Sequence, residues 1–178
     1  MTKRLLHNAQ VIDPEAGTIT RADIRIENGL ITQVSQSPLS ANPNEHSVDC
    51  HNKYLTPGII DIGVKVCEPG ERHKESFKSA GLAAAAGGIT TMVTRPDTTP
   101  AIDSPETLEF IARRANQATP VNVIPMAALT KGRNGREMSE IGFLMDAGAI
   151  AFTDCDHVVS NPKVFARALS YACALGAL

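Results

Sequence analysis

The stretch TPGIIDIGVKVCEP, residues 56–69, decides the fold that this sequence predicts. It carries an almost unbroken run of β-branched residues at 59–66, between Pro57-Gly58 and Glu68-Pro69-Gly70. Such a run between turn residues is typical of a buried strand in a parallel sheet. Polar side chains at the far end of this strand would lie at the mouth of the fold, where parallel α/β proteins place their chemistry.

From residue 54 onward, strands and helices are expected to alternate with the spacing of βα units, roughly 30 residues. The predicted strands are 59–66, 89–94, 121–127 and 149–153, and the predicted helices are 74–86, 104–116, 139–146 and 161–175. This alternation predicts a parallel sheet with right-handed crossovers, in a barrel or in an open doubly wound arrangement. No GxGxxG or Walker pattern follows any strand, which disfavours a nucleotide-binding open sheet.

The N-terminal part, residues 1–53, has the alternating pattern of half-buried strands and predicts a small β unit. The turn Glu27-Asn28-Gly29 lies between two alternating runs and predicts a hairpin, because asparagine and glycine both accept a positive φ. The expected domains are therefore a β part at 1–53 and a strand–helix part at 54–178.

Composition and charge indicate a soluble globular protein. The 178 residues are 43% hydrophobic with a net charge of −2, and nothing points to nucleic acid. No apolar run is long enough to span a membrane, and the N-terminus lacks the apolar region of a signal peptide, so we expect a cytoplasmic protein. Cys50, Cys67, Cys155 and Cys173 have no CxxC spacing, which favours free thiols in a reducing compartment.

Several motifs in the strand–helix part resemble those of the dihydroorotases, cyclic amidohydrolases of the amidohydrolase superfamily. These motifs are PGIID with EPG, AAAAGGITT, PDTTP, ALTKG and DAGAIAFTD. The resemblance implies the N-terminal part of a (β/α)₈ TIM barrel, with about four βα units, preceded by a small β-sandwich unit. A complete barrel needs about 250 residues, so we expect only the N-terminal portion of such a protein.

The resemblance also identifies the positions of the family's active site. Its first strand carries a His-x-His pair that binds zinc and an Arg that holds the substrate carboxylate, and Gly63, Lys65 and Cys67 stand there. Asp97 replaces the Asn of the family's MPNT motif. Asp154 alone keeps its identity, at the first Asp of the FTDDG pattern, and is a weak candidate for a metal ligand because a lone carboxylate binds zinc poorly.

The residues themselves predict ion pairs at these degenerate positions rather than a metal site. Gly63 has no donor atom, and Lys65 would bring a cation towards a dication. We expect a salt bridge between Lys65 and Asp154, which would keep a buried carboxylate from standing unpaired. Arg95 and Asp97 would neutralise each other in the same way.

Two other arrangements of the strand ends stay open at this point. Cys67 and Cys155 would face each other and form a zinc site with Asp154 and a histidine. Alternatively, a cysteine would act as a nucleophile with His157 as its base.

The function implied by the resemblance is that of a dihydroorotase-like protein of pyrimidine biosynthesis. The degenerate positions predict a branch without the zinc centre, with no cofactor, that acts as a non-catalytic partner of aspartate transcarbamoylase. The alternative is an active cyclic amidohydrolase, which interconverts N-carbamoyl-L-aspartate and dihydroorotate with zinc and takes its ligands from a C-terminal half. Half a barrel leaves strand edges exposed, so we also expect association with another copy or another chain.

Overall fold

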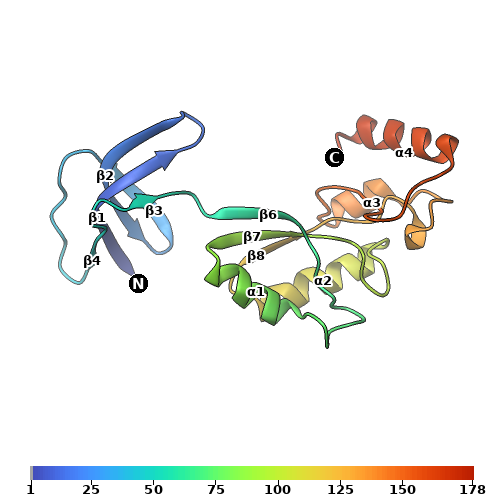
Figure 1. Cartoon of the computed structure of the whole chain (residues 1–178), viewed down its shortest axis with the longest axis horizontal. Helices are drawn as coiled ribbons and strands as arrows, with labels where there is room; N and C mark the ends of the chain where they lie inside the picture. The colour runs from blue at the N-terminus through green and yellow to red at the C-terminus, as the bar shows by residue number, and fades with distance from the viewer. Residues whose placement is uncertain (1) are drawn as a thin grey trace. The chain divides into compact units, whose positions relative to one another are not determined.

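The computed structural model describes residues 2–178 and divides into two compact units (Figure 1). The first unit runs to Pro57, and the second is Gly58–Leu178. The first unit reaches beyond residue 53 because β5 (Tyr54–Leu55) pairs with its longest strand. Within residues 2–178, no helix has the length and apolar character needed to cross a membrane.

The first unit is a single sheet with the strand order β3-β2-β1-β4, and β5 pairs with β1. Its strands are β1 (Lys3–Asp13), β2 (Thr18–Glu27), β3 (Leu30–Ser35), β4 (His46–Asp49) and β5. The predicted hairpin is confirmed, since β2 and β3 pair antiparallel around Asn28 and Gly29, which have φ of +53° and +82°. β4 and β5 run parallel to β1.

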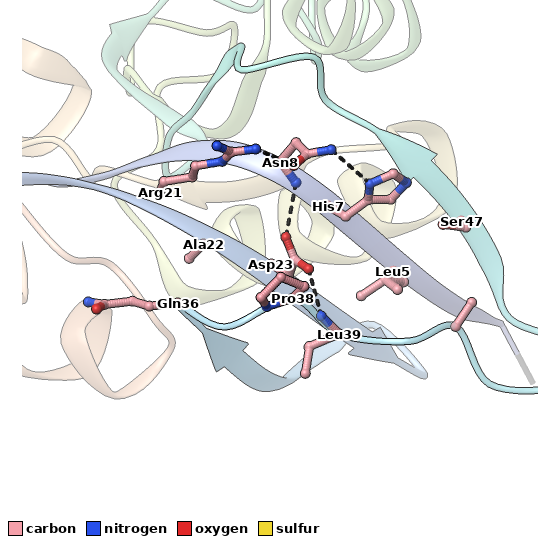
Figure 2. Close-up of a pocket in the computed structure, with 11 residues that line it drawn as sticks. Leu5, His7, Asn8, Arg21, Ala22, Asp23, Gln36, Pro38, Leu39 and Ser47 are labelled. Atoms are coloured by element: carbon pink, nitrogen blue, oxygen red, sulfur yellow. Dashed lines mark hydrogen bonds between the residues drawn. The ribbon is translucent and has the colours of Figure 1, made fainter.

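A buried carboxylate organises one side of this sheet, beside a cavity of about 420 Å³ (Figure 2). Asp23 accepts hydrogen bonds from the backbone amides of Asn8, at 3.0 Å, and Leu39, at 2.8 Å. Asn8 lies at a bulge in β1, where its φ is +58°. Asp23 therefore holds a β-bulge and the loop after β3 in place, and both of its oxygens are used for that purpose.

The second unit contains a parallel sheet with the strand order β6-β7-β8. The strands are β6 (Ile59–Val64), β7 (Ile89–Thr94) and β8 (Asn122–Pro125). The predicted parallel sheet is confirmed, but the fourth predicted strand, 149–153, is reduced to a parallel bridge between Ala127 and Phe152. The Ala127 amide donates to the Ala151 carbonyl and the Thr153 amide to the Ala127 carbonyl, both at 3.0 Å, so the chain continues beside β8 without a regular ladder.

The helices are α1 (Phe77–Ala86), α2 (Pro105–Ala118), α3 (Ile141–Asp146) and α4 (Pro162–Leu175). The predicted N-caps are confirmed, since Ser104 accepts from the Thr107 amide and Asn161 from the Lys163 amide. α1 begins at Phe77 rather than at residue 74, because Ser76 forms a reciprocal capping box with Ser79. α3 likewise begins at Ile141, two residues after the predicted start at 139.

The main core lies between the sheet and the helices. Figure 1 shows α1 and α2 on the same side of β6, β7 and β8. Phe77, Met92, Leu108 and Ile111 are buried there. β6 is an edge strand, and its Ile60 and Ile62 are 61% and 72% exposed, so this strand presents an uncovered apolar surface in the described part of the chain.

A glycine inside α1 tests the packing of this layer. A Cβ at Gly81 would lie 2.7 Å from Thr119 Cβ and 3.1 Å from Pro120 Cδ. We expect Gly81→Ala to destabilise the second unit by about 1 to 3 kcal/mol through overpacking, although alanine is favoured over glycine in a helix by about 1 kcal/mol. Urea unfolding measures this difference.

The matched control is Gly142→Ala in α3, where the nearest atom to the new Cβ would be Tyr171 Oη at 3.4 Å. This contact is close to ordinary van der Waals distance, so Gly142→Ala should leave stability unchanged or raise it. Equal stability of the two variants would contradict the close approach at Gly81.

Candidate functional site

Charged side chains gather where the strands of the second unit end. Lys65 directly follows β6, Arg95 directly follows β7, and Asp156 follows the bridge at Phe152. Because the strands are parallel, their carboxyl ends share one edge of the sheet, which is where ligands bind in α/β proteins. The structure therefore brings three separate segments together at this edge.

Asp97 is the centre of this cluster. Its Oδ2 lies 3.1 Å from Lys65 Nζ and 2.8 Å from Arg95 Nη2, and its side chain is only 3% exposed. The hydrogen bond and the charge of Asp97 raise the pKa of Lys65 above its ordinary value. The predicted pairing of Arg95 with Asp97 is confirmed.

The predicted salt bridge between Lys65 and Asp154 is wrong. Lys65 pairs with Asp97 because Asp97 follows β7, which is hydrogen-bonded directly to β6. Asp154 follows the segment beyond β8, two positions further across the sheet. The order of the strands thus decides which carboxylate the ammonium group reaches.

Asp154 is buried and serves the loop after β8. Its Oδ1 accepts a hydrogen bond from the Thr130 amide at 3.0 Å, and its Oδ2 accepts from the Thr130 hydroxyl. The Thr130 hydroxyl in turn accepts from the Gly135 amide at 2.8 Å. Both carboxylate oxygens are thereby committed to fixing the backbone of this loop.

Two further residues, Asp156 and Arg133, extend the ion-pair cluster. Arg95 Nη2 lies 3.8 Å from Asp156 Oδ1, and Arg133 forms an ion pair with the same oxygen. Arg133 Nη2 also donates to the Asp154 carbonyl at 3.2 Å. Cations and carboxylates therefore alternate from Lys65 through Asp97, Arg95 and Asp156 to Arg133. Asp156 lies just past the predicted strand 149–153, whereas no sequence motif marks Arg133.

The side chains at the strand ends do not fit the zinc that the resemblance implies. Gly63 has no donor atom, and its φ of +93° is unfavourable for any residue with a Cβ. Lys65 supplies an ammonium group, whereas zinc takes neutral imidazoles, thiolates and carboxylates. Across residues 2–178, no three His, Cys, Asp or Glu side chains form a group that could hold a metal ion.

Cys155 and His157 are not arranged as a nucleophile and its base. The Nδ1 of His157 lies 2.9 Å from the carbonyl oxygen of Arg133 and donates to it. Burial, helped by the charge of Asp97, raises the pKa of the Cys155 thiol against the opposing effect of Arg95. A thiol with a raised pKa stays protonated and is a poor nucleophile.

Comparison with solved structures identifies the class of fold. The L-hydantoinase from Arthrobacter aurescens matches 99% of this chain and 40% of its own, with 20% sequence identity and a TM-score of 0.85. A D-hydantoinase from Thermus sp. matches 80% of this chain and 30% of its own, with 26% identity and a TM-score of 0.63. The fold is therefore that of the N-terminal region of the amidohydrolases.

Comparison with family models and curated proteins gives the family. The Dihydro-orotase-like model matches residues 52–178, and the chain belongs to this family. A dihydroorotase from Syntrophotalea carbinolica is 38% identical over 170 residues, which are 96% of this chain. A dihydroorotase from Trichlorobacter lovleyi is 34% identical over 97% of this chain. The chain spans 40% of the length of each of these two relatives.

Another buried carboxylate, Glu68, lies shortly after β6 and connects the strand end to the helices. Glu68 Oε1 accepts from Arg114 Nε at 2.7 Å, and Oε2 accepts from the Phe77 amide, the first of α1, at 3.0 Å. Burial opposes ionisation of Glu68, but the Arg114 and Phe77 hydrogen bonds outweigh it and hold its pKa below 4.5. Through these hydrogen bonds Glu68 connects the segment after β6 to the first residue of α1 and to Arg114 in α2.

This lowered pKa predicts a pH-dependent contribution to stability. A depressed carboxyl pKa stabilises the folded state above the unfolded pKa of 4.5, and the stabilisation is lost as pH falls through the folded pKa. We expect Glu68→Gln to cost about 1 to 3 kcal/mol at pH 7, and expect the difference from the unmodified protein to shrink below pH 4.5. Urea unfolding across this pH range measures both effects.

Glu109→Gln is the control, because Glu109 is exposed on α2 and forms no ion pair among residues 2–178. It should change stability little at either pH. A loss that is the same at pH 7 and pH 3 for Glu68→Gln would mean that the carboxylate charge does not carry the effect.

Proposed function

We propose that this protein is a dihydroorotase-like component of pyrimidine biosynthesis that has lost its metal centre. In this proposal it acts as a non-catalytic partner of aspartate transcarbamoylase and needs no cofactor. The observation that carries the proposal is the pair of cations on Asp97, with Lys65 at 3.1 Å and Arg95 at 2.8 Å. Lys65 stands where the resemblance implies a zinc-binding histidine, and its ammonium group is held there by Asp97, so this position carries a paired cation in place of a metal ligand.

The chemistry of amide-ring hydrolysis supports the loss of catalysis. Metal-dependent hydrolysis needs a metal-activated water and a substrate held in a reactive orientation. Lys65 places a positive charge where the resemblance implies a zinc-binding histidine. Cys67 cannot form the two parallel hydrogen bonds with which an arginine binds a carboxylate. Asp97 offers no hydrogen-bond donor to a substrate carboxylate, unlike the amide that it replaces. Its Oδ1 is buried with no hydrogen-bond donor among residues 2–178.

The retained fold supports a role for the protein surface. Phe77, Leu108 and Ile111 are fully buried in the core, and α2 and α4 have N-terminal caps. A fold can persist for its outer surface when the site that it once carried has changed. Binding to aspartate transcarbamoylase would use this surface rather than the strand ends.

An active cyclic amidohydrolase is the second candidate, and the identities of 34% and 38% to dihydroorotases over nearly the whole chain favour it. In that case the zinc ligands would be supplied by a C-terminal half of the barrel, and the ammonium group of Lys65 would have to move away from Asp97. The reaction would be the reversible cyclisation of N-carbamoyl-L-aspartate to dihydroorotate.

The exposed edge of β6 supports association with another polypeptide. Ile60 and Ile62 lie there without cover in the described residues, and exposed apolar strand edges favour pairing with another chain. The partner would be a second copy or another chain that completes the sheet. We also infer a cytoplasmic location, because the four cysteines are free thiols.

Metal content and turnover test the loss of catalysis. We expect the purified full chain to contain far less than stoichiometric zinc and to show no conversion of dihydroorotate, because Gly63 and Lys65 stand in place of the two zinc-binding histidines that the resemblance implies. Elemental analysis and an ultraviolet absorbance assay of dihydroorotate measure both quantities on one sample.

The triple variant Gly63→His, Lys65→His and Cys67→Arg provides a sharper comparison. We expect it to stay inactive, because a histidine at 63 must adopt a φ near +93° and Asp97 still offers no hydrogen-bond donor to the substrate carboxylate. Adding Asp97→Asn to the triple variant isolates the effect of Asp97. Stoichiometric zinc with turnover in the unmodified protein would refute the non-catalytic assignment.

Co-purification tests the partner. A tagged copy of the full chain should retain aspartate transcarbamoylase from the same source through washes at moderate salt, and Lys65→Met should retain it equally. The equality is expected because the proposed contact uses the outer surface and not the strand ends. Clean absence of the transcarbamoylase with both forms would contradict the proposed partnership.

A further inference from the structure

A cavity of about 370 Å³ lies at the start of α4, away from Lys65 and Asp97. It is lined by Arg136, Glu137, Met138, Lys163, Val164 and Arg167. The loop that carries residues 136–138 follows β8, and α4 follows the bridge at Phe152 (Figure 1). Both segments therefore leave the carboxyl edge of the sheet, where parallel α/β proteins bind ligands.

The charges around this cavity are unbalanced. Arg136, Lys163 and Arg167 are cations whose charged groups form no ion pair or hydrogen bond within residues 2–178. The carboxylate of Glu137 is engaged by Lys131, so it does not neutralise them. Three cationic groups therefore surround one opening without a matching anion.

Two of these cations repel each other on the helix. Lys163 and Arg167 are four residues apart in α4, and like charges at this spacing destabilise a helix. An anion bound between Lys163 and Arg167 would attract both side chains and so offset their mutual repulsion. The helix itself does not require cations at these two positions, since its amphipathic packing rests on Ala168 and Ala172.

The chemistry of the lining selects the kind of anion. Arginine guanidinium groups bind phosphate oxygens in a bidentate manner, and lysine adds a mobile point charge. The cavity volume falls within the range of small-molecule pockets, roughly 300 to 1,000 Å³, and exceeds the needs of a single phosphate group. Met138 and Val164, both half-buried, provide an apolar wall for the remainder of a ligand.

We propose that this cavity binds a small phosphorylated molecule, with Arg136, Lys163 and Arg167 on its phosphate groups. The site shares no residue with the ion-pair cluster around Asp97. It therefore stands whether or not the protein retains hydrolytic activity.

Calorimetric titration of the full chain with inorganic pyrophosphate, at physiological ionic strength, tests this site. We expect saturable binding that weakens by about tenfold or more in Lys163→Gln/Arg167→Gln, the loss expected when charge-assisted hydrogen bonds are removed. Arg136→Gln, which lies outside any helix, should weaken binding in the same direction and provides a second variant should the first fail to fold.

The matched control is Lys78→Gln/Arg113→Gln, which removes the same charge from exposed positions on α1 and α2. It should keep its affinity within about twofold, since general surface charge is screened beyond about 8 Å at this ionic strength. Absence of saturable binding, or equal weakening in this control, would overturn the site. Equal affinity for malonate would overturn the phosphate assignment in favour of a dicarboxylate.

Discussion

The buried carboxylate of Asp97 is the constraint on which the carboxyl edge of this sheet depends. An ionised carboxylate that is 3% exposed requires opposite charge at close range, because its loss of hydration is otherwise uncompensated. Lys65 and Arg95 supply that charge from two adjacent strands. A third cation at Asp97 would have to displace one of these two, so both Lys65 and Arg95 are fixed by this one carboxylate.

Much of the fold follows from local sequence. The β-branched run in β6 and the pairs Ser104-Pro105 and Asn161-Pro162 predict a strand and two helix starts, since the responsible side chains act within one turn or one strand. The predicted start of α1 at residue 74 was wrong, because Lys74 and Glu75 also favour a helix but the cap is Ser76. The predicted fourth strand, 149–153, forms only a single bridge to Ala127. A regular ladder depends on how the chain continues after β8, and the apolar pattern of 149–153 does not reveal that.

The candidate site was less accessible from sequence, for the same physical reason. Arg95 and Asp97 are two residues apart, so their pairing is a local property and was predicted. The ion-pair partner of Lys65 depends on which strands are neighbours in the sheet. Asp154 was the wrong partner because the sequence does not give the strand order, although it does predict a salt bridge with a carboxylate. Arg133 and Asp156 come from loops, where no periodic pattern marks a functional side chain.

The bulge at Gly63 in β6 is connected to the position of Lys65, which directly follows this strand. Ile62 pairs with Val93 and Val64 with Thr94, so Gly63 is an extra residue in β6, and its φ of +93° is the conformation that allows this. The Arg95 amide then donates to the Val64 carbonyl at 2.9 Å, which aligns Lys65 with the start of the Arg95–Asp97 turn. A one-residue slip reverses the side on which the following side chains lie. The glycine that removes a potential ligand at 63 is therefore also the residue whose backbone brings the Lys65 ammonium group to Asp97.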